Sequence, residues 1–339
     1  MNRLVVYDPR MAGASVKILY VGGYARSGST LLSRVLGESP GMVCVGETRY
    51  LWSRGLLNNV DCGCGVPFRS CPFWSAVGEE AFGGWDRVDA ERLTEVDRVT
   101  NLPQALPFHW ASWLRPGMRE KISDYTACLA GLYAAITRVS GAKMIVEMSK
   151  DATFACLLRR MPDSDVRVVH LVRDSRAVAY SWARRRRMPS PIGAQVFMPQ
   201  SGPIETATKW LAWNTSLHVL AAARFPYLKL SYESFVADPG AVLQRLSAFA
   251  DEALVPSESE LRGSEVKLGD HHIFSGNPMR ATTGWMPIRL DSEWQTQLTT
   301  AQFAKVTALT WPLLRLYGYP LVPAARRVSG AVVGSGQPG

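Results

Sequence analysis

The 339-residue chain has no long apolar stretch that is free of helix-breaking residues. Its longest run without a charged side chain, Met188 to Ile204, contains four prolines, which argues against a membrane-spanning helix. The first residues already carry Arg3, Asp8 and Arg10, and no apolar block of signal-peptide length precedes them. We therefore expect a soluble, cytoplasmic protein without a membrane partner.

Cysteine is also scarce, with six residues in the whole chain. Three are isolated in apolar surroundings, as is usual in a reducing compartment. These are Cys44, Cys128 and Cys156. Cys62, Cys64 and Cys71 lie close together in the sequence, but a structural zinc site needs four ligands. His109 would complete such a site, although nothing in the spacing requires it. A turn stabilised by packing, or a disulfide, is the simpler interpretation.

Acidic residues are fewer than basic ones, with 29 Asp and Glu against 38 Lys and Arg, a formal net charge of +9. An excess of this sign favours an anionic partner: nucleic acid, an anionic membrane or a phosphorylated small molecule. With 47% apolar and 20% charged residues, the chain can form a hydrophobic core and does not have the composition of a disordered protein.

Short apolar stretches alternate with stretches of helical spacing. The first unit is a strand from Val16 to Gly22, a glycine-containing loop and a helix from Ser29 to Gly37. Further strands are expected at residues 42–45, 143–146, 166–172 and 227–230, and helices at residues 125–139, 175–186 and 207–224. This alternation predicts the α/β class, with a central parallel β-sheet flanked by helices. In such sheets ligands bind at the carboxyl ends of the strands.

Residues 1–324 are expected to form a single domain. Residues 58–116 break the pattern with loops that contain Gly, Pro, Cys and Trp, which predicts a loop and helix insertion covering one side of the site. The proline-rich stretch Met188–Pro203 is predicted to be a long loop, of the kind that often forms a lid. Residues 325–339 have the composition of a disordered tail.

The loop from Gly23 to Thr30 nearly fits the phosphate-binding pattern G-x-x-x-x-G-K-[ST], which makes the predicted sheet P-loop-like. Ser29 stands where the pattern has lysine, so the cation that pairs with the terminal phosphates of a nucleoside triphosphate is missing. Arg26 supplies a cation three residues earlier. The glycines and the following helix N-terminus still offer N–H groups to a phosphate. A P-loop phosphotransferase, which needs that lysine and magnesium, is therefore the weaker alternative.

The segment Arg26-Ser-Gly-Ser-Thr-Leu31 resembles the 5′-phosphosulfate loop of sulfotransferases that use 3′-phosphoadenosine-5′-phosphosulfate (PAPS). Its Arg-Ser-Gly form is most similar to the tyrosylprotein sulfotransferase branch and to bacterial relatives. The resemblance implies a donor-binding loop made of six consecutive residues: Arg26, Ser27, Gly28, Ser29, Thr30 and Leu31. A second segment, from Val172 to Ser181, matches the family's 3′-phosphate segment. Arg173 at the strand tip and Ser181 two turns along the next helix can converge on one anion.

The same resemblance implies roles in the chemistry. Val45-Gly-Glu47-Thr-Arg49 is similar to the Glu-Thr-Arg segment of the tyrosylprotein branch, where the glutamate takes the proton of the acceptor hydroxyl. Arg49 would orient that base or bind acidic groups of the acceptor. Lys150 and Arg26 would stabilise negative charge on the transferring sulfuryl group. Asp151 and His271 are the next candidates for the base.

Three further positions carry weaker expectations. Tyr232, at a strand end, is expected either near the adenine or in the core. Arg280 lies in a loop that resembles the C-terminal phosphate-binding loop, which implies a second cation on the 3′-phosphate, with Ser275 and Asn277 beside it. Arg185 matches an arginine of the tyrosylprotein branch and is expected on the acceptor side.

Together these features predict a PAPS-dependent sulfotransferase that requires no metal and releases adenosine 3′,5′-bisphosphate. Its acceptor would be a hydroxyl of a small natural product, a phenol or a tyrosine. A non-catalytic protein that binds anions or nucleic acid through Arg184–Arg187 is the other alternative. No recognisable nucleic-acid module accompanies that run, so no nucleic-acid partner is expected. A donor other than PAPS stays conceivable, and the sequence specifies no oligomeric state.

Overall fold

A central sheet of five parallel strands organises the computed structural model, which describes residues 15–100, 116–185, 197–254, 256 and 260–322. The strand order is β2-β3-β1-β4-β5, so β1 lies in the middle of the sheet. The bounds are Val16–Gly22 (β1), Met42–Gly46 (β2), Met144–Lys150 (β3), Ser164–Val172 (β4) and Tyr227–Ser231 (β5). The predicted α/β class with a parallel sheet is confirmed.

Strand β1 shows why these segments are apolar throughout. Ile18 and Tyr20 are fully buried in the core on one face of the sheet, and Leu19 and Val21 are fully buried in the core on the other face. Because side chains alternate across a strand, a strand covered on both faces needs a continuous apolar run. This run, ended by glycines, let the sequence predict the limits of β1 correctly.

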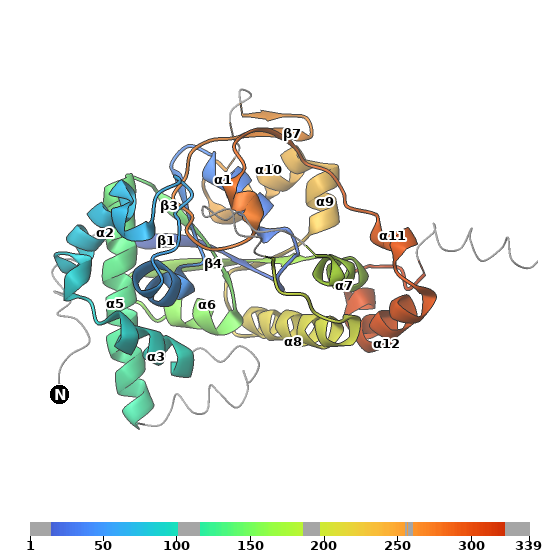
Figure 1. The fold of residues 1–339 in the computed structure, drawn as a ribbon, viewed down its shortest axis with the longest axis horizontal. Coiled ribbons are helices and arrows are strands. Elements are labelled where there is room, and N and C mark those ends of the chain that lie inside the picture. The colour runs from blue at the N-terminus through green and yellow to red at the C-terminus, as the bar shows by residue number, and fades with distance from the viewer. Residues whose placement is uncertain (1–14, 101–115, 186–196, 255, 257–259, 323–339) are drawn as a thin grey trace, which may run out of the picture.

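Helices cover both faces of the sheet (Figure 1). One face packs against α1, α9 and α10, and the other against α5, α6 and α8. Their bounds are Ser29–Gly37 (α1), Pro116–Ser140 (α5), Ala152–Leu158 (α6), Pro203–Ala222 (α8), Tyr232–Ala237 (α9) and Pro239–Ala250 (α10). Helices α7 (Ser175–Ala183) and α12 (Thr300–Leu316) meet α8 through Ala179, Ala207 and Val306.

In the described residues, the insertion between residues 58 and 116 is made of loops and helices, as predicted. It contains α2 (Pro72–Phe82) and α3 (Ala90–Thr100), with short 3₁₀ turns at Phe68–Ser70 and Trp85–Arg87. Phe68, Trp74 and Trp85 pack against one another in the core, with ring centroids 5.0 and 5.8 Å from that of Phe68. These aromatic residues therefore stabilise the insertion by burial.

Other differences lie at element ends and near the C-terminus. Helix α7 ends at Ala183 instead of residue 186, while β3 continues to Lys150, past the expected end at residue 146. A small antiparallel sheet of β6 (Leu261–Arg262), β7 (Glu265–Leu268) and β8 (Gly284–Pro287) was not predicted. A 3₁₀ turn (Pro278–Ala281) and helix α11 (Trp294–Gln297) complete this region. His109, residues 188–196 of the predicted lid and the predicted tail lie outside the described residues.

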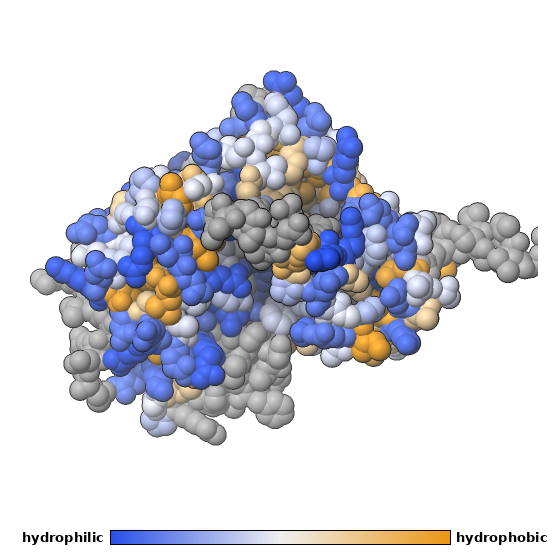
Figure 2. Space-filling model, viewed as in Figure 1, coloured by the Kyte–Doolittle hydropathy of each residue, from blue (hydrophilic) through white to orange (hydrophobic). Residues whose placement is uncertain are grey.

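The described helices include none that is both long and apolar enough to cross a membrane. On the face drawn in Figure 2, apolar residues form small separate groups among polar ones.

Candidate active site

Every strand of the parallel sheet delivers a residue singled out by the sequence at its carboxyl end. Across the sheet the order is Glu47 directly after β2, Lys150 at the end of β3, the loop of residues 23–28 after β1, Arg173 after β4 and Tyr232 after β5. Because all five strands run in parallel, these ends lie along one edge of the sheet. Segments far apart in sequence are thereby gathered into one candidate site.

The loop after β1 is shaped by close contacts. A Cβ on Gly23, whose φ is +152°, would lie 2.4 Å from the carbonyl oxygen of Leu171, and a Cβ on Gly28, whose φ is +91°, would lie 2.3 Å from the ring of Tyr232. Only glycine fits at these two positions. Ser27 is buried, and its hydroxyl has no hydrogen-bond partner among the described residues.

Arg173 joins this loop directly. Its Nη1 donates a hydrogen bond of 3.1 Å to the carbonyl oxygen of Arg26, and its guanidinium lies 4.6 Å from the ring centroid of Tyr232. Trp182 of α7 adds a second link, since its Nε1 donates to the carbonyl oxygen of Ala25 at 3.3 Å and its ring lies 5.1 Å from the guanidinium of Arg26. The two segments predicted to bind the two ends of one nucleotide are therefore adjacent.

Three other residues predicted to bind the donor or the acceptor lie in different parts of the site. Ser181 is buried in α7, although no hydrogen bond joins it to Arg173 in the described part of the chain. Arg280 donates from Nη1 to the carbonyl oxygen of Asp61 at 2.8 Å, and its charge acts on Glu47, so it lies on the Glu47 side of the site rather than beside Arg173. Arg185 is exposed and stacks on Phe197 at 3.7 Å.

A missed segment, Arg289–Asp291, passes Arg173 and Tyr232 instead. The carbonyl oxygen of Asp291 lies 3.4 Å from Nη2 of Arg173, with the Asp291 carboxylate at 3.6 Å, and the carbonyl oxygen of Arg289 accepts from the hydroxyl of Tyr232 at 3.3 Å. Nothing in the local sequence pattern marked this segment, because it carries no glycine loop and follows no long strand. It forms the wall of the site at this end.

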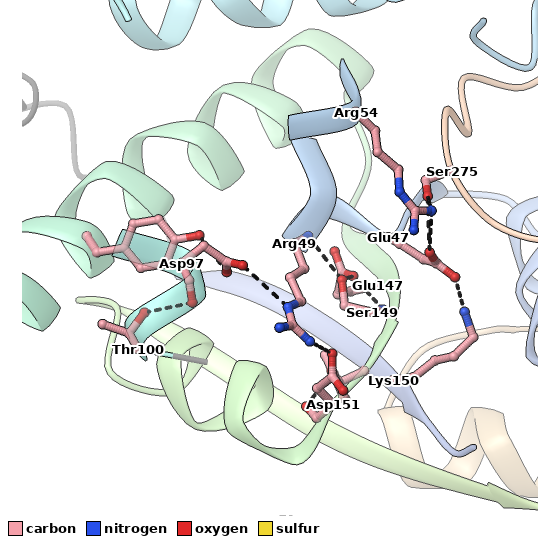
Figure 3. A network of polar contacts seen from close by, with 12 residues as sticks. Glu47, Arg49, Arg54, Asp97, Thr100, Glu147, Ser149, Lys150, Asp151 and Ser275 are labelled. Carbon is pink, nitrogen blue, oxygen red and sulfur yellow. Dashed lines mark hydrogen bonds and ion pairs between the residues drawn. The ribbon is translucent and has the colours of Figure 1, made fainter. Parts of the chain in front are cut away.

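Glu47 and Lys150 meet across the ends of neighbouring strands (Figure 3). Oε1 of Glu47 accepts a hydrogen bond from the Lys150 ammonium, and Oε2 accepts from the Ser275 hydroxyl at 3.1 Å. Arg54, which the sequence did not mark, donates to Ser275 at 2.7 Å and lies 3.6 Å from Oε2 of Glu47. One carboxylate is thus held by an ammonium, a guanidinium and a hydroxyl.

These neighbours determine the ionisation of Glu47. Burial raises its pKa, but the charges of Lys150 and Arg54 and the hydrogen bonds from Lys150 and Ser275 outweigh burial and bring its pKa below the ordinary value of 4.5. Glu47 is therefore a carboxylate at neutral pH. A group that is to accept a proton must first be deprotonated, and Glu47 fulfils this condition.

The segment around Ser275 connects Glu47 with the loop after β1. A Cβ on Gly276, where φ is +129°, would lie 3.8 Å from Oγ1 of Thr30 and 3.9 Å from Oε1 of Glu47. The phosphate-loop helix and the candidate base therefore approach the same point. His271, the alternative base, accepts from the N–H of Ile273 at Nδ1 and bonds the Arg280 carbonyl through Nε2, which leaves no ring nitrogen for an acceptor proton.

Arg49 lies in a buried ion-pair network. Its Nη1 bonds to Oδ2 of Asp151, its Nε lies 3.4 Å from Oδ2 of Asp97, and 11% of its side chain is exposed (Figure 3). Burial lowers the pKa of Arg49, but the two carboxylates reverse that effect and raise it. Burial also raises the pKa of Asp151 to about 6 despite the opposing charge of Arg49. The geometry favours a structural ion pair over the acceptor contact expected of Arg49.

Glu147 is a second buried carboxylate that sequence reasoning did not single out. Its oxygens accept hydrogen bonds from the hydroxyls of Thr48, Tyr133 and Ser149 and from the N–H of Ser149. Burial raises its pKa, and these hydrogen bonds oppose that rise. Glu147 ties together the residue after Glu47 and the residue before Lys150.

The sheet with its flanking helices has the architecture of sulfotransferase domains. The structure superposes on the sulfotransferase domain of the Synechococcus PCC 7002 olefin synthase over 91% of this chain and 98% of that domain, with a TM-score of 0.51 and 20% identity. For the sulfotransferase domain from the curacin biosynthetic pathway the coverage is 91% and 99%, the TM-score 0.48 and the identity 18%. For sulfotransferase STF1 from Mycobacterium tuberculosis H37Rv the values are 72% and 70%, 0.36 and 12%. No protein-family model and no curated protein match the sequence.

The Arg49 network leads to a stability prediction. Arg49→Met leaves two buried carboxylates without their cation and should lower the free energy of unfolding by about 3–5 kcal/mol, measured by urea denaturation. Arg98→Met is the control, because the Arg98 side chain is 71% exposed and its ion pair with Glu95, three residues away, lies on the surface. If Arg49→Met retains the parent stability, the network is not structural and an acceptor role for Arg49 regains support.

Proposed function

We propose that this protein is a PAPS-dependent sulfotransferase that transfers a sulfuryl group to an acceptor hydroxyl. The observation that carries the proposal is the order of groups along the carboxyl edge of the sheet. An ionised glutamate and a lysine lie on one side of a phosphate-type loop, and an arginine bonded to that loop lies on the other. The likeness to a sulfotransferase domain in fold supports the same assignment.

The described residues fit the two anionic ends of PAPS. The hydroxyl of Ser27 and Nε of Arg173 are buried without a hydrogen-bond partner in the described part of the chain, and both belong to segments that resemble phosphate-binding segments. The loop N–H groups at the start of α1 are further donors for a phosphate. We assign residues 26–31 to the 5′-phosphosulfate end and Arg173 with Ser181 to the 3′-phosphate. When bound, PAPS supplies the transferable sulfuryl group.

Glu47 accepts the proton of the acceptor hydroxyl in this proposal. Its low pKa makes it a weak base while Lys150 is bound to it. An anionic donor competes with Glu47 for the ammonium of Lys150, and as Lys150 turns toward the donor, burial raises the pKa of Glu47. Lys150 and Arg26 then stabilise negative charge that develops during transfer. Binding of the donor would thus strengthen the base at the moment it is needed.

A metal-free reaction is consistent with this arrangement of cations. Sulfuryl transfer resembles phosphoryl transfer in its reliance on alignment and charge stabilisation. A sulfuryl group carries less charge than a phosphoryl group, so protein cations can replace magnesium. The acceptor we propose is a hydroxyl of a small natural product, a phenol or a tyrosine. Arg54, with 45% of its side chain exposed beside Glu47, is better placed than Arg49 to meet an acidic acceptor.

The direct test incubates the purified chain with ³⁵S-labelled PAPS and a panel of alcohols, phenols and tyrosine peptides without added magnesium. Label should enter at least one hydroxyl acceptor, with release of adenosine 3′,5′-bisphosphate. Phosphoryl transfer from ATP that depends on magnesium would support the P-loop alternative instead. Steep salt-dependent binding to unrelated oligonucleotides, without transfer, would support a nucleic-acid-binding protein.

Glu47→Gln should reduce kcat by about 10²–10⁴-fold, because the amide cannot accept the acceptor proton. The variant should bind adenosine 3′,5′-bisphosphate nearly as tightly as the parent, measured by calorimetry, because the proposed nucleotide contacts lie elsewhere. Near-parental turnover would exclude Glu47 as the base and redirect attention to Asp151.

The pH dependence of kcat/KM tests the coupling between Glu47 and Lys150. The acid limb of the parent profile should lie below pH 4.5, since the pKa of Glu47 is held below that value. In Lys150→Met the loss of the cation should raise this pKa and move the acid limb of the residual activity to higher pH. Lys143→Met, a change of an exposed lysine just before β3, should leave the limb in place. If the acid limb of Lys150→Met lies at the same pH as that of the parent, Lys150 does not control the pKa of Glu47.

Ser181→Ala tests the 3′-phosphate assignment. Loss of one hydrogen bond to a charged group should weaken binding of adenosine 3′,5′-bisphosphate by about tenfold, while binding of adenosine 5′-phosphate stays unchanged. Ser175→Ala is the matched control, because it lies in the same helix and bonds Thr310 at 2.7 Å. Equal losses for both nucleotides would show that Ser181 acts only through the fold.

A further inference from the structure

Three cysteines and one histidine converge at the junction between the insertion and the C-terminal loop. The sulfurs of Cys62, Cys64 and Cys71 and a ring nitrogen of His272 all lie within 4.8 Å of one another. The sulfurs of Cys64 and Cys71 are 3.6 Å apart, and Nδ1 of His272 lies 3.3 Å from the sulfur of Cys71 and 3.8 Å from that of Cys62. His272, some 200 residues away in sequence, is the fourth member that sequence reasoning sought at His109.

The spacing matches the coordination shell of zinc. With Zn–S bonds of about 2.3 Å and Zn–N bonds of about 2.0 Å, a tetrahedron has S···S edges of about 3.8 Å and S···N edges of about 3.5 Å. The three distances in the cluster lie close to these edges. None of the three cysteines forms a disulfide, and three thiols cannot all be paired within such a group. A disulfide, one of the two alternatives drawn from the sequence, is not formed among these three residues.

The surroundings hold the four ligands in place. The N–H groups of Cys64 and Trp74 donate hydrogen bonds to the sulfurs of Cys62 and Cys71. The ring of His272 is stacked on Phe73, with centroids 4.7 Å apart, and its carbonyl oxygen accepts from Nε1 of Trp74 at 2.8 Å. These contacts orient the side chains before any ion is bound, as partners of metal ligands commonly do.

Two further features fit a bound metal. A Cβ on Gly63 would lie 2.0 Å from the imidazole of His271, so the absence of a side chain between Cys62 and Cys64 lets this segment pack against the loop that carries His272. Three thiolates, a neutral histidine and Zn²⁺ together carry one negative charge. Arg280, whose guanidinium bonds the carbonyl oxygen of Asp61 and interacts with Cys62, supplies a neighbouring positive charge. This accounts for the position of Arg280 on this side of the molecule.

We propose that Cys62, Cys64, Cys71 and His272 bind one structural zinc ion. All four positions of a tetrahedral ion are filled by protein, which is the arrangement of a structural rather than a catalytic site. The ion would join the insertion to the loop that carries Ser275, the hydroxyl bonded to Glu47. It would therefore fix one side of the candidate active site without taking part in the transfer of any group.

The full chain, purified under reducing conditions without chelator, should contain one zinc per molecule by elemental mass spectrometry. Cys71→Ala and His272→Ala should lower zinc affinity by more than the roughly 10–100-fold typical of the loss of a supporting partner, measured by competition with a chromogenic chelator. Cys128→Ala is the control, because Cys128 is a buried cysteine of α5 that does not belong to the cluster. This variant should keep its zinc. Because zinc binding is measured without an activity assay, the outcome of this test does not depend on the proposed function.

Cobalt exchange of the unaltered chain covers the case in which the variants fail to fold. Cobalt held by three thiolates and one histidine should give thiolate-to-metal charge-transfer absorption and the strong visible bands of tetrahedral cobalt. A chain that holds no zinc and takes up neither zinc nor cobalt would overturn the proposal. A Cys64–Cys71 disulfide in freshly purified, metal-free protein would overturn it as well.

Discussion

The hydrogen bonds accepted by the buried carboxylate of Glu147 hold together the part of the site on which the proposed chemistry depends. They fix Thr48 and Ser149, the direct neighbours of Glu47 and Lys150. The described contacts of Glu147 are with hydroxyl and amide donors rather than with a cation. A buried carboxylate without a cation beside it lowers the stability of the fold unless all of its hydrogen-bond donors are in place. The ends of β2 and β3 are therefore held in one register, and Glu47 meets Lys150 as a consequence.

Charge balance separates the arginines that build the fold from those that remain for a ligand. Arg176 is fully buried, and its guanidinium is bound by Asp174 and by the carbonyl oxygens of Pro320 and Leu321. Arg49 is bound by Asp151 in the same manner. Arg173 instead faces the loop after β1, where it contacts two backbone carbonyls and lies 3.6 Å from the carboxylate of Asp291. Its Nε has no hydrogen-bond partner among the described residues, so this guanidinium can still donate to an anion.

The sequence predicted what depends on local pattern and missed what depends on distant segments meeting. Continuous apolar strands and the glycine loop located β1, α1 and the residues after each strand. Arg54, Ser275 and Glu147 gained their positions only when a π-helix at Leu51–Leu57, the C-terminal loop and α5 packed beside β2 and β3. Helices were predicted for the insertion, but their limits were not, because glycine, proline and tryptophan obscured their period. His272 could not be paired with Cys62 from spacing, since the chain between them folds into most of the domain.

Backbone conformation gives an independent reason to regard Arg26 and Lys150 as functional. Both adopt left-handed φ values, +74° and +73°, which cost a residue with a side chain roughly 1–2 kcal/mol. Glycine would remove that strain at either position. The strain is tolerated where the two side chains bring positive charge to neighbouring strand ends, one before α1 and one against Glu47. The proposed requirement for two cations beside a transferring anionic group would account for this strain.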